Sequence, residues 1–205
     1  MSLVENLKLA NDAMRAVQKL NYGSSNRGAQ LDGMPEAISG TRGEFANHMY
    51  GFTYGSMLAS LGRQDEPLGL ASFVAPAAVA RRLRFGNCEA RSSLALIYAA
   101  THSAVRPLEL FSVGEDHVFL VIGRTKGHPG NWAEWNAEAV ICDAWAEVCY
   151  SAGELGQRLQ QAPVAAVVGS DPKTHILFEH LGGWPPPALR HFLDEAGLND
   201  IQWSA

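Results

Sequence analysis

The chain opens with an apolar stripe of helical period. Between residues 2 and 20 the apolar side chains recur at steps of three or four residues: Leu3, Leu7, Ala10, Met14 and Val17. Such steps place these side chains on one face of a helix. Residues 45–61 and 72–83 are also predicted to be helices, with Pro76 near the start of the second, where proline is tolerated. The chain before Phe85 is therefore predicted to be mainly helical.

Residues 21–43 interrupt this helical part. The stretch is rich in Gly, Ser, Asn and Arg and shows almost no apolar periodicity. It predicts a long loop, and loops of this length in compact domains are often functional. We expect it to gate the cleft of a functional site.

The pattern changes after Asn87. Residues 89–102 contain too many apolar side chains for a surface helix, so they predict a buried central helix. Short segments then follow that are β-branched or aromatic and bounded by Gly, Pro or Asn, as is typical of consecutive antiparallel strands. These segments are residues 108–113, 117–123 and 139–145.

The remainder of the chain predicts further short elements. Ser151 with Glu154 three residues later is a capping-box pattern for a helix that runs to about Gln161. The apolar segments 164–170 and 174–180 predict edge strands.

The end of the chain repeats the helical pattern, and the whole sequence predicts an α+β fold. Residues 185–197 begin with prolines and end at a glycine, which indicates a final helix. We expect a helical N-terminal segment over residues 1–84 to pack on a core over residues 85–205, in one compact domain.

Composition and charge narrow the class of protein. The 205 residues are 47% hydrophobic and 18% charged, which suits a folded domain with a real core. The net charge is −5, and the one basic cluster, Arg81, Arg82 and Arg84, is short, so nucleic acid is not an expected partner. No apolar stretch approaches the roughly 18 residues of a membrane span. Glu5 and Asp12 break the order of a signal peptide, which predicts cytoplasmic synthesis and folding.

The cysteines point to thiol chemistry. The chain has three, an odd number that favours reduced thiols over a disulfide framework. Cys88 follows a Gly-Asn turn at the start of the central helix, His117 opens the second predicted strand, and Asp143 lies near the end of the third. A cysteine nucleophile needs its thiolate stabilised, which a helix N-terminus and an imidazolium can do, and the imidazole needs a third group to orient it.

The segments around these residues resemble a known superfamily. "GNCEARSSLAL", "EDHVFLVIG" and "AVICDAWAE" are similar to the papain-like and transglutaminase-like Cys-His-Asp proteins, and most similar to bacterial effector and toxin domains of papain-like fold. The resemblance covers about residues 84–150. It implies that Cys88 is the nucleophile, His117 the general base and acid, and Asp143 the orienting carboxylate.

The chain departs from that pattern at two places. Ala90 stands where such domains often have an acidic residue, and Ala144 stands where they often have proline. Neither departure removes a member of the triad.

The resemblance implies a thiol-dependent amide hydrolase, without a cofactor, that acts on a protein substrate. Glutamine deamidases and cysteine proteases are both found among these effector domains, and several are delivered into other cells. A thioester intermediate can instead be passed to an amine, so an acyl or amine transferase of transglutaminase or arylamine N-acetyltransferase type is an alternative. Against the acetyltransferase, the Arg-Gly-Gly lead before the cysteine is absent. A catalytically inactive interaction module is the other alternative.

Further residues are candidates for the oxyanion or substrate site. The side-chain amide of Asn87 could donate to an oxyanion, or Asn87 could simply cap the helix. Glu89 could touch substrate or lie on a solvated face. Trp145 could form an aromatic wall of the cleft or pack in the core.

The other two cysteines are predicted to lie in the core. Strand alternation turns Cys142 to the face opposite Asp143, and Cys149 lies just beyond that strand. A zinc site formed by both of them with Cys88 and His117 would lack the close Cys-x-x-Cys pair of structural sites, so no metal is expected.

Overall fold

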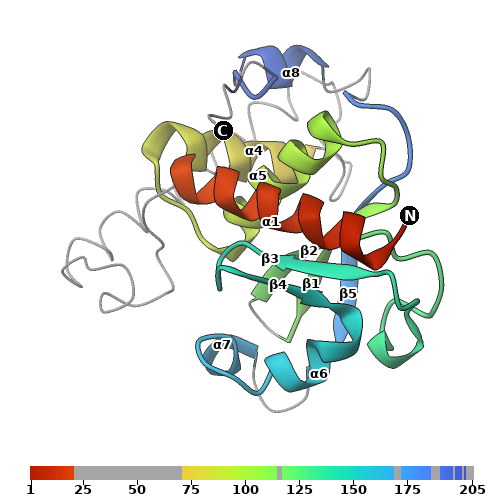
Figure 1. The fold of residues 1–205 in the computed structure, drawn as a ribbon. Helices are drawn as coiled ribbons and strands as arrows, with labels where there is room; N and C mark the ends of the chain where they lie inside the picture. Colours follow the sequence, from red (N-terminus) through yellow and green to blue (C-terminus); the bar gives the residue numbers. More distant parts are fainter. Residues whose placement is uncertain are drawn as a thin grey trace, which may run out of the picture.

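The computed structural model describes residues 1–20, 71–114, 117–168, 172–185, 190–195, 197–199 and 201. Within these residues an antiparallel sheet has the strand order β4-β3-β2-β1-β5, and helices pack against it (Figure 1). The strands are β1 (Leu108–Val113), β2 (His117–Ile122), β3 (Val140–Asp143), β4 (Val148–Ser151) and β5 (Thr174–His180). The α+β class predicted from the sequence is confirmed.

Strand alternation gives the sheet two buried faces. Leu120 and Ile122 of β2 pack in one hydrophobic cluster, whereas Phe119 and Val121 pack in another. Successive side chains of a strand point to opposite faces, so each of these clusters belongs to one face of the sheet. Because both faces are covered there, every residue of β2 is buried, and His117 is its one polar side chain.

The first cluster joins the sheet to the long helices. These are α1 (Leu3–Leu20), α4 (Ala71–Leu83) and α5 (Cys88–His102). The apolar stripe of the first twenty residues is confirmed, because Ala10 and Val17 are fully buried and Leu3, Leu7 and Met14 are partly buried against the same cluster. Helix α5 is central: it contacts α1, α4 and strands β1, β2 and β3. Its many small and apolar residues are explained by this position.

Pro76 lies inside α4 and not in its first turn. The sequence prediction placed it near the start, where the missing N–H costs nothing. In the observed position the helix continues past the proline with one hydrogen bond fewer.

The second cluster is covered by short helical turns. These are η1 (Trp132–Glu134), η2 (Ala152–Glu154), α6 (Leu155–Arg158) and α7 (Ala165–Val168). The helix predicted to follow Ser151 and to run to about Gln161 is present in part, because Ser151 is the N-cap residue of η2 and α6 ends at Arg158. The Ser151 hydroxyl donates to Glu154 Oε1 at 3.2 Å, but no side-chain bond caps the backbone. Ser151 also pairs with Val140 and ends β4, a strand that the sequence did not predict.

Of the two predicted edge strands, one is confirmed and one is wrong. Residues 174–180 form β5, which pairs with β1. Residues 165–168 form α7 instead of a strand, because β5 occupies the edge of β1. The end of α7 packs on the turn after β1: a Cβ at Gly114 would lie 2.0 Å from the carbonyl oxygen of Val168, and Gly114 has φ +63°.

The final predicted helix is present as α8 (Arg190–Glu195). Gly197, where the sequence predicted its end, has φ +63°, which glycine adopts without strain. The predicted loop at 21–43 and the predicted helix at 45–61 lie outside the described residues. No helix among the described residues is long and apolar enough to cross a membrane.

Candidate active site

The N-terminus of α5 positions Cys88. Asn87 is the N-cap residue: its Oδ1 accepts a hydrogen bond from the backbone N–H of Ala90 at 3.0 Å. Of the two roles considered for Asn87, capping is confirmed. Cys88 is therefore the first residue of the helix, where the helix dipole favours a negatively charged side chain. Its side chain is buried.

The register of β2 and β3 brings His117 and Asp143 together. Leu120 pairs with Cys142, so Asp143 stands opposite Phe119, on the same face as His117. His117 donates from Nε2 to Asp143 Oδ2 at 2.7 Å, and both residues are buried. The other carboxylate oxygen, Oδ1, accepts the N–H of Ala146 at 2.9 Å. Both oxygens of Asp143 are thus engaged, which fixes the orientation of the carboxylate and of the imidazole.

The second ring nitrogen of His117 is left for the thiol. Nδ1 is buried and makes no hydrogen bond of standard geometry to the described residues. Burial alone lowers the pKa of His117, but the charge and hydrogen bond of Asp143, with further contributions from Cys88, raise that pKa to about 10. The imidazole is therefore protonated at neutral pH. The structure brings Cys88, His117 and Asp143 into one cluster.

Two polar residues near the start of α5 tie the helix to these strands. The Ser92 hydroxyl donates to the carbonyl of Val118, next to His117, at 2.9 Å. The Arg91 guanidinium donates to the carbonyl of Ala144, next to Asp143, at 3.2 Å. Ser92 and Arg91 are both buried. Their signal in the sequence is their polarity near the start of a helix that is otherwise apolar.

Arg91 also reaches the turn between β3 and β4. Its Nη1 lies 3.5 Å from Glu147 Oε1, and Glu147 has φ +60°, in the left-handed region that non-glycine residues seldom adopt. The first turn of α5 thereby holds the turn that follows Asp143.

Trp145 packs against His117. The two ring centroids lie 5.1 Å apart in an edge-on arrangement, and Trp145 is 1% exposed. Of the two roles considered for Trp145, packing in the core is confirmed. By filling the space beside the imidazole, the indole keeps water away from it. Glu89 lies in the first turn of α5 and is half-buried.

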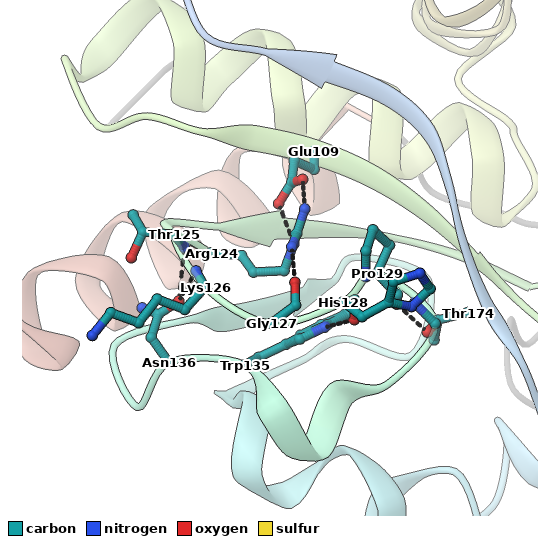
Figure 2. Close-up of polar contacts among 11 residues, drawn as sticks. Glu109, Arg124, Thr125, Lys126, Gly127, His128, Pro129, Trp135, Asn136 and Thr174 are labelled. Carbon is teal, nitrogen blue, oxygen red and sulfur yellow. Dashed lines mark hydrogen bonds and ion pairs between the residues drawn. The ribbon is translucent and has the colours of Figure 1, made fainter.

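A second polar cluster fixes the connection between β2 and β3 (Figure 2). Arg124 Nε donates to Glu109 Oε2 at 2.9 Å, and Arg124 Nη1 donates to the carbonyl of Gly127 at 2.8 Å. The guanidinium carbon also lies 5.5 Å from the ring centroid of Phe111 and 5.7 Å from that of Trp135. Arg124 follows the end of β2 that is opposite His117, so this cluster holds the far ends of the two strands that carry His117 and Asp143.

The cysteines do not assemble around a metal. Cys142 lies in the cluster that α1 and α5 cover, whereas Cys88 lies in the cluster on the other face of the sheet. Among the described residues no group of three or more His, Cys, Asp or Glu side chains could hold a metal ion. A cavity of about 330 Å³ lies beside Asn6 and Lys126, and it is not lined by Cys88, His117 or Asp143.

Comparison with protein-family models, with curated proteins and with solved structures gave no match to this chain. What the site can do is therefore inferred from its own residues.

Proposed function

We propose that this protein is a thiol-dependent amide hydrolase. Cys88 is the nucleophile, His117 the general base and acid, and Asp143 the residue that orients His117. The observation that carries the proposal is the buried 2.7 Å hydrogen bond between His117 and Asp143, at the N-terminus of the helix that begins with Cys88. Burying charged groups is costly, so a buried pair of this kind beside a cysteine favours catalysis over packing.

The reaction proceeds through a thioester. The Cys88 thiolate attacks the carbonyl carbon of an amide, and a carbon–sulfur bond forms. Protonated His117 gives its Nδ1 proton to the nitrogen of the substrate, the carbon–nitrogen bond breaks, and ammonia or an amine leaves. His117 then takes a proton from water and the hydroxide attacks the thioester. The carbon–sulfur bond breaks, the acid is released, and the Cys88 thiolate and protonated His117 are restored. Asp143 holds Nε2 throughout, so that Nδ1 faces the sulfur.

The negative oxygen of the tetrahedral intermediate needs hydrogen-bond donors. The backbone N–H of Cys88, at the start of α5, is the first candidate. The side-chain NH₂ of Asn87 is the second, because only its Oδ1 is used in capping. Glu89, in the same turn, is a candidate for substrate contact.

The proposed substrate is another protein, attacked at a glutamine side chain or at a peptide bond. The order of a cysteine on a helix, a histidine on a strand and an aspartate on the adjacent antiparallel strand supports a papain-like fold and an effector or toxin of the glutamine-deamidase or cysteine-protease type. A protein of that type would be delivered into another cell.

Thiol labelling tests the proposed pair of Cys88 and His117. We expect iodoacetamide at about pH 6 to label Cys88 before the other two cysteines, because a helix N-terminus and an imidazolium both stabilise a thiolate. The rate should fall at least about tenfold in His117→Ala, because the imidazolium that stabilises the thiolate is gone. Cys149 is the internal control, since it is the half-buried thiol on the other face of the sheet. Preferential labelling of Cys149, or equal rates at Cys88 in both proteins, would contradict the proposal.

Product analysis separates the reactions. Protein mixtures treated with the wild type and with Cys88→Ala are compared for released ammonia, which indicates deamidation, and for new N-termini, which indicate cleavage. Incorporation of an added primary amine without either product would assign the protein to the transferases. A labelled Cys88 with none of these products from any protein mixture would favour the interaction module.

A further inference from the structure

Cys142 and Cys149 occupy directly opposite positions on neighbouring strands. The register of β3 and β4 pairs them. The bond from the N–H of Ala152 to the carbonyl of Ala139, at 2.9 Å, marks a hydrogen-bonded position of the same ladder. Such positions alternate along antiparallel strands, so Cys142 and Cys149 form a non-hydrogen-bonded pair. In these pairs the Cα atoms lie about 4.5 Å apart, within the range that a disulfide spans.

The two thiols lie close together beneath α1. The Cys142 thiol donates to the carbonyl of Ala10 at 3.3 Å, and the Cys149 sulfur lies 3.8 Å from that of Met14. The Cys149 thiol, through a hydrogen bond, and burial together raise the pKa of Cys142 well above its usual value. Thiols are weak hydrogen-bond partners, so little is lost when these contacts are replaced.

We propose that Cys142 and Cys149 form a redox-modification site, at which a low-molecular-weight disulfide such as oxidised glutathione converts the two thiols into a cross-strand disulfide. Cys149 is the point of entry, because it is half-buried on the edge strand β4, whereas Cys142 is fully buried. This inference goes beyond the proposed hydrolase activity and does not depend on it.

The thiol–disulfide exchange takes place in two steps. The Cys149 thiolate attacks one sulfur of the reagent, the reagent's S–S bond breaks, and one reagent thiol leaves after taking up the proton that Cys149 lost. The Cys142 thiolate then attacks the Cys149 sulfur, and the second reagent thiol leaves with the proton from Cys142. Two protein thiols are oxidised and one reagent disulfide is reduced to two thiols. The second step should accelerate as the pH rises, because the buried Cys142 must first lose its proton.

The link would form one residue from Asp143. It would join β3 to β4 beside the turn that follows Asp143, on the face opposite the His117 hydrogen bond. The disulfide would therefore link the two strands of the hairpin and leave both oxygens of the Asp143 carboxylate in their hydrogen bonds.

Full-length Cys88→Ser protein provides the test, because it has only these two cysteines. The native protein is equilibrated with mixtures of oxidised and reduced glutathione at about pH 8, acid-quenched, denatured and alkylated. Cleavage after Glu147 separates Cys142 from Cys149, so their peptides stay joined only through a disulfide. We expect both thiols to disappear together, the two peptides to be joined, and dithiothreitol to reverse the change.

The matched control is Cys149→Ser in the same background, where Cys142 should stay alkylatable. The wild type provides a second measurement, in which the same two peptides should join while Cys88 stays outside the link. A glutathione adduct that persists on Cys149 with Cys142 free, links between two chains, or alkylation of both thiols at full oxidation would overturn the proposal. So would a disulfide that includes Cys88.

Discussion

His117 carries a charge although its side chain is fully buried. Its side chain is 0% exposed and that of Asp143 is 1% exposed. A buried charge is stable only when a partner compensates for it, and here the partner is an oriented carboxylate at 2.7 Å. The pair thus keeps His117 protonated, and the proposed thiol mechanism uses the proton on Nδ1.

The charged state of His117 predicts how stability depends on pH. The pKa of His117 is about 10 in the folded protein and near 6.5 when unfolded. The stabilisation is therefore fully present below about pH 6.5 and is lost as the pH rises towards about 10. We expect the free energy of unfolding of the Cys88→Ser protein, measured with urea, to fall as the pH rises through this interval; this background is used because the Cys88 thiol would otherwise exchange a proton over the same interval. In Asp143→Asn most of this fall should disappear, because the charge that raises the pKa is gone.

The exposed His102 provides the control for this measurement. His102→Gln in the same Cys88→Ser background should keep the fall in stability. If the Cys88→Ser proteins with and without Asp143→Asn showed the same pH dependence, the charge of Asp143 would not be what holds the proton on His117.

Two adjacent serines of α5 allow a matched comparison. Ser92 and Ser93 are both 0% exposed, but only Ser92 donates a hydrogen bond, to Val118, whereas the Ser93 hydroxyl has no partner among the described residues. Ser92→Ala should lower the free energy of unfolding by about 0.5–1.5 kcal/mol. Ser93→Ala should leave it unchanged or raise it slightly, because a buried hydroxyl without a partner is removed. Urea unfolding measures both, and equal losses would contradict a specific role for Ser92.

At the scale of elements, three separate units of secondary structure each contribute one residue to the site. Helix α5 presents Cys88, strand β2 presents His117, and the β3–β4 hairpin presents Asp143. Arg91 fastens the helix to the hairpin turn through the carbonyl of Ala144. Arg124 holds the connection from β2 to β3 by donating hydrogen bonds to Glu109 and to the carbonyl of Gly127 (Figure 2).

The Arg124 cluster predicts a large loss of stability when it is broken. Glu109 is 0% exposed and its carboxylate is paired with Arg124. Arg124→Met leaves that carboxylate buried without its partner, which should cost about 3–5 kcal/mol of unfolding free energy. Lys8→Met, which breaks the exposed pair with Asp12, should have no measurable effect. Similar losses in the two variants would mean that the pairing of Glu109 contributes little.

At the scale of the molecule, the sheet is enclosed between two layers (Figure 1). Helices α1, α4 and α5 cover one face, and the short turns from η1 to α7 pack against the other. Helix α1 contacts both β3 and β4, so the start of the chain closes the core beneath the hairpin that carries Asp143.

The contribution of α1 can be measured with one substitution made at two positions. Val17 is fully buried and Val4 is 75% exposed, and both lie on this helix. Val17→Ala should lower the free energy of unfolding by about 1–3 kcal/mol, through lost burial and the cavity left behind. Val4→Ala should be nearly neutral. Thermal or urea unfolding tests this, and a neutral Val17→Ala would mean that α1 is not part of the cooperative core.

Local patterns in the sequence were enough for much of the fold. The three-to-four spacing from Leu3 to Val17 predicted α1, and the apolar run with turn residues on either side predicted β1 with its observed bounds. These signals work because periodicity reports which face of an element is buried. Strand β4 was missed because residues 148–151 are short and only half-buried, so no alternation marks them.

The sequence by itself determined the central helix, the strands around it and the three residues Cys88, His117 and Asp143 that are candidates for catalysis. Only the tertiary structure decided that His117 and Asp143 meet, because their contact depends on the register of β2 and β3. It also decided that Arg91 is buried against a distant turn, and that Cys142 faces Cys149. Periodicity describes each element alone, whereas these contacts form between elements, where only packing fixes which atoms come within bonding distance.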